Sequence, residues 1–360
     1  MKKQYNIIII YSRSQESGGA LRASYIAEYL SKRGHNVRFI KPLRRLPFQL
    51  DFPVSLIYYL LKTIFMDCDF IIVVKPYPNT CIPAIFKKLQ NKKIILDIDD
   101  LDYAYREGVL MHAGRFLQEP FPRFFDAITV HNDNLRDFLI KEWNIPERKI
   151  HSLPQGIDLE LLDGKNIDRD LRKKLGLEGR HIITFTAHLD VSTDMKPILE
   201  AIKIVREKIE NCTLLVAGRG PYQKSFERLA KDMGLESNVI FTGPFEIELL
   251  PSYIALGDTC IVYYEDRMVN HFRTSMKLRE YLAMEKPVAC NDIGDLRQFK
   301  EYTYQSKTDV RDFADKIVEA LTCKSNRPAE GYNYVIKNFS WEKIIENFET
   351  DTLDPLLNTT

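Results

Sequence analysis

Short apolar runs alternate with longer stretches of helical period along most of the chain. Runs rich in β-branched residues predict buried strands at 5–10, 37–40, 70–74, 94–98 and 127–130. The first run is followed by a helical pattern at 21–32, which Gly34 ends. Strands that alternate with helices in this way are typical of a parallel α/β sheet.

A second alternating series begins after residue 180. Its strands are predicted at 182–186, 213–217, 239–242, 259–263 and 287–289, and its helices at 197–209, 223–233, 275–284 and 313–321. The turn-rich segment 154–158 and the charged stretch 163–180 separate the two series. The pattern therefore predicts two open parallel sheets with a cleft between them, where ligands bind beyond the carboxyl ends of the strands.

Composition agrees with a two-domain globular protein of 360 residues, 45% hydrophobic and 28% charged, and excludes collagen, disordered chains and disulfide mini-proteins. The overall net charge is only +1, but residues 1–150 hold 23 Lys and Arg against 16 Asp and Glu. This first part favours an anionic partner such as a phosphate, an acidic glycan or a lipid surface. Nucleic acid is not expected, because no dense basic run with interleaved aromatics occurs.

The six cysteines lie far apart and form no CxxC pair, which predicts no zinc site and a reduced, cytoplasmic protein with buried thiols. The apolar run 7–10 is too short for a secretion signal. The longest apolar stretch, 52–65, contains Lys62 and is too short to span a bilayer. We expect a soluble chain, or one that lies against a membrane.

Two features of the first series are candidates for chemistry. Gly18 and Gly19 lie between the first strand and its helix, where backbone N–H groups could bind an anion or form a simple glycine turn. A dinucleotide site is disfavoured, because GxGxxG is absent. Asp97, Asp99 and Asp100 cluster at the end of an apolar strand, where one carboxylate could orient a hydroxyl or act as general base. Solvated loop acids and a divalent metal are the other interpretations.

The loops of the second series offer further candidates. Gly218 and Arg219 follow one strand and Phe245 follows another, so either loop could contact a flat ring or a ribose, or form a tight turn. Lys196 precedes a helix and could reach a diphosphate, although a lone lysine is usually surface.

The densest group of polar residues lies at 270–284. Ser275 is a plausible helix cap, and its helix start together with Arg273, Thr274 and Lys277 predicts a site for one or two phosphates. Glu280 lies about a turn and a half further on, where a carboxylate could bind vicinal ribose hydroxyls. The alternative is a capped helix with a solvated basic face.

These segments together resemble the family-4, or group 1, glycosyltransferases, whose GT-B fold has two Rossmann-like domains. The matching segments are the Gly18-Gly19 loop, the stretches 30–37, 97–101, 153–158, 215–221 and 239–243, the strongest match at 277–288, and the ending 339–342. The resemblance implies an acceptor domain at 1–160, a nucleotide-sugar donor domain at 161–335, and a C-terminal helix at 336–360 that crosses back to the first domain. It also implies retention at the anomeric carbon and no metal or other cofactor.

Individual roles follow from the same resemblance. Glu280 matches the second glutamate of the E-x7-E motif, which binds the ribose, and Lys196 matches the lysine that neutralises the diphosphate. Phe272 stands where the first glutamate of that motif is usual, and His188 where an arginine is usual, so Arg273 is expected to supply the missing charge. Asp99 stands where a histidine is often found.

The predicted activity is therefore a retaining hexosyltransferase that moves a sugar from a UDP- or GDP-sugar to a glycan or lipid-linked acceptor, with Asp99, Asp100, Lys196 and Arg273 as its catalytic residues. The alternatives are a non-catalytic nucleotide- or carbohydrate-binding protein and a nucleotide-sugar epimerase of the same fold. Basic residues of the first domain, among them Arg44, Arg45, Lys87, Lys88, Lys92 and Lys93, would suit peripheral contact with the inner face of a membrane. For the apolar stretch 56–65, a core helix under the sheet is favoured over a membrane-facing one.

Overall fold

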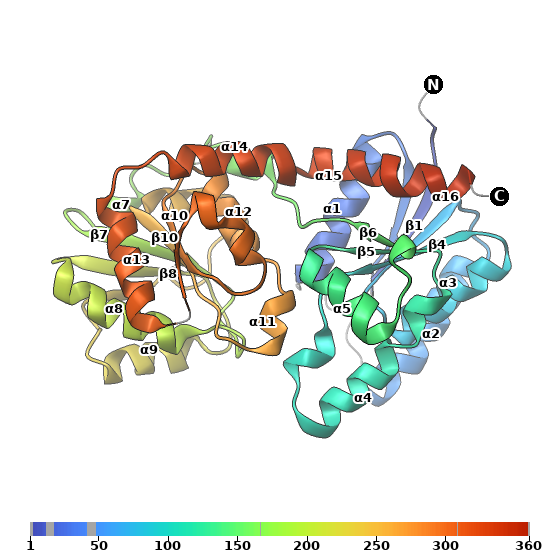
Figure 1. Ribbon diagram of the computed structural model, residues 1–360, viewed down its shortest axis with the longest axis horizontal. Helices are drawn as coiled ribbons and strands as arrows, with labels where there is room; N and C mark the ends of the chain where they lie inside the picture. Colours follow the sequence, from blue (N-terminus) through green and yellow to red (C-terminus); the bar gives the residue numbers. More distant parts are fainter. Residues whose placement is uncertain (1–2, 12–17, 42–47, 166, 308, 359–360) are drawn as a thin grey trace. The chain divides into compact units, whose positions relative to one another are not determined.

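The computed structural model describes residues 3–11, 18–41, 48–165, 167–307 and 309–358. They form two compact units (Figure 1). Unit 1 consists of Met1–Gly156 together with Trp341–Thr360, and unit 2 of Ile157–Ser340. Arg44 and Arg45 lie outside the described residues.

Unit 1 is built on a six-stranded parallel sheet in the order β2-β1-β3-β4-β5-β6. Its strands are β1 (Asn6–Tyr11), β2 (Asn36–Ile40), β3 (Phe70–Val74), β4 (Lys93–Ile98), β5 (Ala127–Val130) and β6 (Ile150–Ser152). Its α-helices are α1 (Gly18–Lys32), α2 (Phe48–Ile64), α3 (Pro78–Leu89), α4 (Gly108–Gln118), α5 (Asp133–Trp143), α15 (Trp341–Phe348) and α16 (Asp354–Asn358). The short 3-10 helix η1 (Asp102–Tyr105) follows β4.

Unit 2 repeats this plan with the order β12-β11-β10-β7-β8-β9, again parallel throughout. Its strands are β7 (His181–Thr186), β8 (Cys212–Ala217), β9 (Val239–Phe241), β10 (Thr259–Val262), β11 (Val288–Asn291) and β12 (Tyr304–Ser306). Its α-helices are α6 (Leu159–Leu162), α7 (Leu171–Lys174), α8 (Met195–Lys208), α9 (Gln223–Asp232), α10 (Leu250–Leu256), α11 (Met268–Phe272), α12 (Met276–Ala283), α13 (Val310–Thr322) and α14 (Arg327–Phe339). The prediction of two parallel α/β domains is confirmed.

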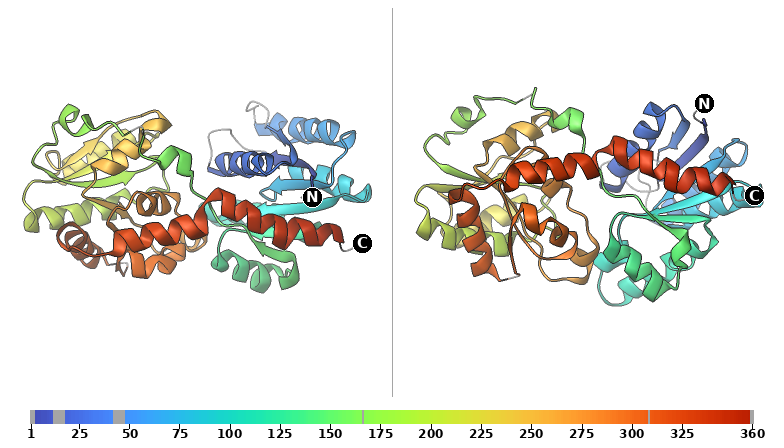
Figure 2. Two further views of the ribbon diagram at one scale, coloured as in Figure 1. Left: turned by 90° about the horizontal axis from the view of Figure 1, so that it is seen from above. Right: turned by 45° about the horizontal axis from the view of Figure 1, so that its top comes forward.

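The last helices return to unit 1 because their apolar face completes its core. Trp341 of α15 is 1% exposed and stacks on Tyr25 of α1, with ring centroids 5.5 Å apart. The two helices run side by side (Figure 2). A Cβ at Gly156 would lie 2.5 Å from the Trp341 ring, so a glycine is needed where the chain leaves unit 1.

Helix α2 corrects the interpretation of 56–65 as a core helix. Its buried positions are hydroxyl-bearing: Ser55, Tyr59 and Thr63. Several of its apolar side chains face outward: Ile57 is 57% and Leu61 65% exposed. Phe65, directly after the helix, is 89% exposed. The inward hydroxyls find partners on neighbouring backbone, such as the bond from Tyr59 Oη to the Tyr11 carbonyl at 2.7 Å, so the helix packs by its polar side.

Five cysteine thiols are buried, and Cys323 is exposed, which corrects the prediction that all are buried.

Candidate functional site

Each sheet has a switch point at which neighbouring strands lead to connections in opposite directions. In unit 1 the first strand, β1, lies between β2 and β3, and in unit 2 the first strand, β7, lies between β8 and β10. Ligands of open α/β sheets bind beyond the carboxyl ends of the strands at this point. The candidate residues follow β1, β3 and β4 in unit 1, and β7, β8, β9 and β10 in unit 2.

The start of helix α12 is held by buried polar groups. Ser275 is its N-cap and accepts a hydrogen bond from the Leu278 N–H at 3.2 Å. The Ser275 N–H donates to Asp295 Oδ1 at 3.4 Å. Both groups are buried, so they serve the helix itself. A contact of Ser275 with phosphate stays a prediction.

Arg279, which the sequence analysis missed, anchors the same helix turn. Its guanidinium is fully buried, 2.9 Å from Asp295 Oδ2, and lies over the rings of Phe299 and Phe339 at 5.1 and 4.5 Å. Burial raises the pKa of Asp295, against the opposing effects of Arg279 and of hydrogen bonds that include one from Thr274. Ion pair and ring contacts together orient the residues that α12 presents.

Lys277 and Glu280 both have strongly shifted pKa values. Burial, helped by the charge of Arg273, lowers the pKa of Lys277 to about 8. Burial raises the pKa of Glu280 to about 7, with Lys277 opposing the shift and Asp158 adding to it. Lys277 Nζ lies 4.5 Å from the centroid of the Phe185 ring. Two groups that change charge close to neutral pH mark this helix face as a candidate binding site.

Arg273 lies near Lys277 and Glu280. Its guanidinium carbon is 4.9 Å from the centroid of the Tyr264 ring. Its Nη1 donates to Asn270 Oδ1 at 3.1 Å. Because its charge lowers the pKa of Lys277, the two cations are electrostatically coupled. Together they form a concentration of positive charge suited to an anionic group.

Lys196 is placed at the start of α8 with 72% of its side chain exposed, 4.0 Å from Glu200 Oε1. His188, in the loop after β7, also points to solvent. Asp194, just before α8, was missed: it is 6% exposed, accepts from the Glu265 N–H at 3.0 Å and pairs with Arg267. It ties the loop after β7 to the loop after β10, and its position before a helix was the only sequence signal.

The glycine loop after β8 lies against the backbone of the loop after β7. Gly218 has φ of 145°, and a Cβ there would lie 1.8 Å from the Ala187 carbonyl oxygen. The Arg219 carbonyl accepts from the Leu189 N–H at 2.9 Å, while the Arg219 side chain is exposed. Phe245 packs on Tyr253 with ring centroids 4.5 Å apart. Roles for these residues in donor binding stay predictions.

In unit 1 the structure brings Gly19 and the predicted carboxylates to one side chain, Lys75. A Cβ at Gly19 would lie 2.9 Å from Lys75 Cε, whereas Gly18 faces open space. Lys75 Nζ lies 3.2 Å from Asp99 Oδ1. Burial raises the pKa of Asp100 to about 6; Lys75 opposes the shift and Asp99 adds to it. Lys75 was missed, although a lysine directly after a buried apolar strand is a recognisable signal.

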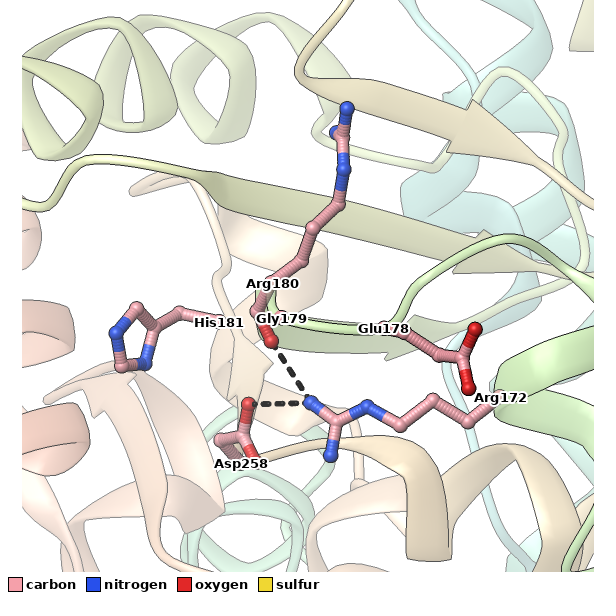
Figure 3. A pocket seen from close by; sticks show the side chains of 6 residues that line it. All are labelled: Arg172, Glu178, Gly179, Arg180, His181 and Asp258. Atoms are coloured by element: carbon pink, nitrogen blue, oxygen red, sulfur yellow. Dashed lines mark hydrogen bonds and ion pairs between the residues drawn. The ribbon is translucent and has the colours of Figure 1, made fainter.

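A surface pocket in unit 2 lies at the opposite, amino end of β7 (Figure 3). It is lined by Arg172, Glu178, Gly179, Arg180, His181 and Asp258. Arg172 Nη2 donates to the Arg180 carbonyl at 2.7 Å and pairs with Asp258 at 3.2 Å. The pocket contains no predicted site residue. It lies away from the carboxyl ends of the strands, where ligands of this fold bind.

Within the described residues, no three His, Cys, Asp or Glu side chains are grouped so as to hold a metal ion. The same residues include no helix that is both long and apolar enough to span a bilayer.

Known proteins resemble this chain in sequence and in fold. Residues 180–323 match the family described as glycosyl transferases group 1. Alpha-D-kanosaminyltransferase of Streptomyces kanamyceticus is 24% identical over 179 residues, which cover 49% of this chain and 45% of that protein. A GDP-mannose-dependent alpha-(1-6)-phosphatidylinositol monomannoside mannosyltransferase of Mycolicibacterium smegmatis is 25% identical over 114 residues, 31% of this chain and 30% of that protein. The chain thus spans less than half the length of these curated relatives.

Solved structures match over nearly the whole chain. Sucrose-phosphate synthase from Thermosynechococcus elongatus has a TM-score of 0.79 at 16% identity, covering 99% of this chain and 100% of that one. Anabaena Alr3699/HepE, in complex with UDP and glucose, has a TM-score of 0.75 at 13% identity, with coverage of 99% and 100%. The chain has the GT-B fold. Within residues 180–323 it is similar to the group 1 glycosyltransferases.

Proposed function

We propose that this protein is a retaining glycosyltransferase that moves a hexose-type sugar from a UDP- or GDP-sugar to a glycan or lipid-linked acceptor. The observation that carries the proposal is the pair Lys277 and Glu280 on α12, whose pKa values are shifted to about 8 and about 7. A carboxylate for ribose hydroxyls and a cation for a diphosphate lie within one helix turn. The solved complex of Anabaena Alr3699/HepE with UDP and glucose supports a nucleotide as ligand.

The chemistry that unit 2 would supply is stabilisation of the leaving group. Breaking a sugar–diphosphate bond leaves negative charge on the phosphate, which fixed cations stabilise. Arg273 and Lys277 provide coupled positive charge, and Lys196 provides an exposed, mobile one. Stabilisation of the leaving group is thus assigned to these three side chains, and no step is assigned to a metal ion or another cofactor.

The acceptor is assigned to unit 1. Asp99 and Asp100 follow β4 at the carboxyl end of the unit 1 sheet, beside Lys75. A carboxylate in this position can orient an acceptor hydroxyl and receive its proton. Gly18 and Gly19 start α1 at the same edge, where backbone N–H groups favour an anion.

We further propose that α2 rests on the inner, anionic face of a membrane, with the protein otherwise in the cytoplasm. Ile57 is 57% exposed and Leu61 65%, and Lys62 is exposed beside them. The α3 residue Lys87 is buried and donates to the Ile64 and Met66 carbonyls, so the prediction that Lys87 contacts the membrane is wrong. An apolar helix face beside an exposed lysine suits an anionic bilayer surface.

A non-catalytic nucleotide-binding protein is the second candidate, favoured by Phe272 where the family has a glutamate and by the exposed His188. The test measures thermal shifts and calorimetric binding with UDP, GDP and ADP, followed by release of free sugar from the matching nucleotide sugars. Binding with slow hydrolysis supports the enzyme, and binding without hydrolysis or transfer supports the binding protein. Conversion to a different nucleotide sugar would identify an epimerase, and no binding at all rejects the proposal.

A further inference from the structure

A buried ion pair lies beneath the start of α12 in unit 2. Arg279 belongs to this helix, and its Nη1 lies 2.9 Å from Asp295 Oδ2. Asp295 lies at the start of η5 (Gly294–Tyr302), the 3-10 helix that follows β11. The two side chains are 0% and 1% exposed. Because both charges are enclosed by the protein, neither of them contacts a ligand itself.

The pair holds both backbone groups of Ser275. Arg279 Nη1 also donates to the Ser275 carbonyl at 2.9 Å, and Asp295 Oδ1 accepts from the Ser275 N–H at 3.4 Å. The Thr274 side chain forms a further hydrogen bond with Asp295. The Ser275 hydroxyl is occupied as well, since it accepts from the Leu278 N–H. The two residues that lead into α12 are thus fixed by the ion pair and by the cap.

Arg273 directly precedes this fixed segment and is itself partly exposed. Its Nη1 donates to Asn270 Oδ1 at 3.1 Å, and its guanidinium lies over the Tyr264 ring. Gly294, the neighbour of Asp295, lies against Asn270, because a Cβ there would be 2.4 Å from the Asn270 carbonyl oxygen. The start of η5 therefore supports the chain on both sides of Arg273.

Stability alone does not account for Arg279. Its Nε and Nη2 are buried without a hydrogen-bond partner among the described residues, and its guanidinium lies over the rings of Phe299 and Phe339. Unpaired buried donors cost free energy, and apolar side chains often replace a buried ion pair without loss of stability. An apolar residue could pack between the two rings, but it could not hold Asp295 and the Ser275 carbonyl together.

We propose that Arg279 and Asp295 are positioning residues for the diphosphate of the donor, because they fix the segment that presents Arg273. The inference rests on the proposed function and adds to it two residues that do not touch the ligand. A cation that is already fixed loses less conformational entropy on binding than a mobile one. The pair therefore contributes to diphosphate affinity and not to recognition of the nucleoside.

The experiment compares the affinity of UDP, measured by calorimetry, with that of uridine, measured by ligand-observed NMR. GDP and guanosine are used in the same way where the wild type binds GDP. Arg279→Met removes the donor to both Asp295 and Ser275, and it is expected to weaken UDP binding about tenfold with uridine binding unchanged. Asp295→Asn keeps an acceptor for the Ser275 N–H, so a smaller loss of about threefold is expected.

Arg22→Met is the matched control. Arg22 is an equally buried arginine that pairs with an aspartate, Asp97, but it belongs to unit 1. Removing one partner of a buried ion pair destabilises the fold, so Arg22→Met and Arg279→Met should both lower the melting temperature. Only Arg279→Met should lower the affinity for UDP, which separates positioning from a general loss of stability.

Three results overturn the inference: unchanged UDP affinity in Arg279→Met and Asp295→Asn, an equal loss for UDP and uridine, or an equal loss in Arg22→Met. If Arg279→Met does not fold, Asp295→Asn decides in its place. In each of these cases the wild type still binds the nucleotide, and the proposed function stands. A wild-type protein that binds neither UDP nor GDP rejects the proposed function and this inference with it.

Discussion

Arg22 and Asp97 form a two-pronged ion pair inside unit 1. Arg22 Nε lies 2.7 Å from Asp97 Oδ2, and Arg22 Nη2 lies 2.9 Å from Asp97 Oδ1, with both side chains completely buried. Nη2 also donates to the Leu153 carbonyl at 2.6 Å, and the Thr129 hydroxyl donates to Asp97 at 2.7 Å. The pair thereby joins α1, β4, β5 and the segment that leads out of unit 1.

Breaking this pair is expected to destabilise unit 1. Asp97→Asn leaves the Arg22 charge buried without its counter-ion, which costs about 3–5 kcal/mol. Urea unfolding followed by circular dichroism measures the loss. The exposed pair of Arg136 and Glu147 is the control, and Glu147→Gln there should cost less than about 1 kcal/mol. Equal losses in both variants would contradict the role assigned to burial.

Glu280 should couple nucleotide binding to pH. Its ionised form accepts hydrogen bonds from ribose hydroxyls, so UDP affinity should rise as pH increases through about 7. Glu280→Gln should lose about tenfold in affinity at pH 8, roughly 1.5 kcal/mol, and much less at pH 6. Calorimetry at both pH values checks this, and an equal loss at the two values would speak against ribose binding by the carboxylate.

Ionisation of Glu280 should raise UDP affinity but lower the folding stability of the protein. The pKa of Glu280 is raised from 4.5 to about 7 by burial, so the folded state binds more protons than the unfolded state between these values. Stability contributed by this group is therefore lost as pH rises across that window. Thermal unfolding should show Glu280→Gln more stable than wild type at pH 8 and equal to it near pH 4.5. A deficit at pH 8 would mean that the ionised carboxylate is satisfied by the protein itself.

Lys196 offers a test of the diphosphate assignment. Lys196→Ala should lower kcat/KM for the nucleotide sugar about 100-fold, because a cation at the leaving group is removed. Lys203, exposed on the same helix α8, is the matched control, and Lys203→Ala should leave the rate unchanged. Near-wild-type activity of Lys196→Ala would show that Lys196 is an ordinary surface lysine with no role at the diphosphate.

Vesicle flotation tests the apolar face of α2. The double variant Ile57→Ser with Leu61→Ser should lose binding to phosphatidylglycerol vesicles, because about 1.5–3 kcal/mol of burial is removed per side chain. The control is the double variant Val109→Ser with Phe116→Ser. It replaces two exposed apolar side chains of α4. Binding that survives the α2 changes, or that is as strong to phosphatidylcholine, would reject the anionic-membrane proposal.

Much of the fold follows from local patterns. The buried runs at β1, β3 and β4 are continuous in β-branched and apolar residues, as expected for strands covered on both faces. Ser275 begins α12 as its capping pattern indicates. Helix α2 was misjudged because its composition is apolar, whereas its inward residue Tyr59 donates to the Tyr11 carbonyl at the end of β1, a partner that only the folded chain supplies.

The sequence by itself determined the order of strands and helices, the two sheets, and most of the polar residues that gather at their carboxyl edges, because periodicity and capping act within a few residues. Only the tertiary structure decided that Lys75 meets Asp99, that Arg279 meets Asp295 and that Glu280 titrates near neutral pH. Those facts depend on burial and on charges brought together from distant segments, and neither is a local property of the chain.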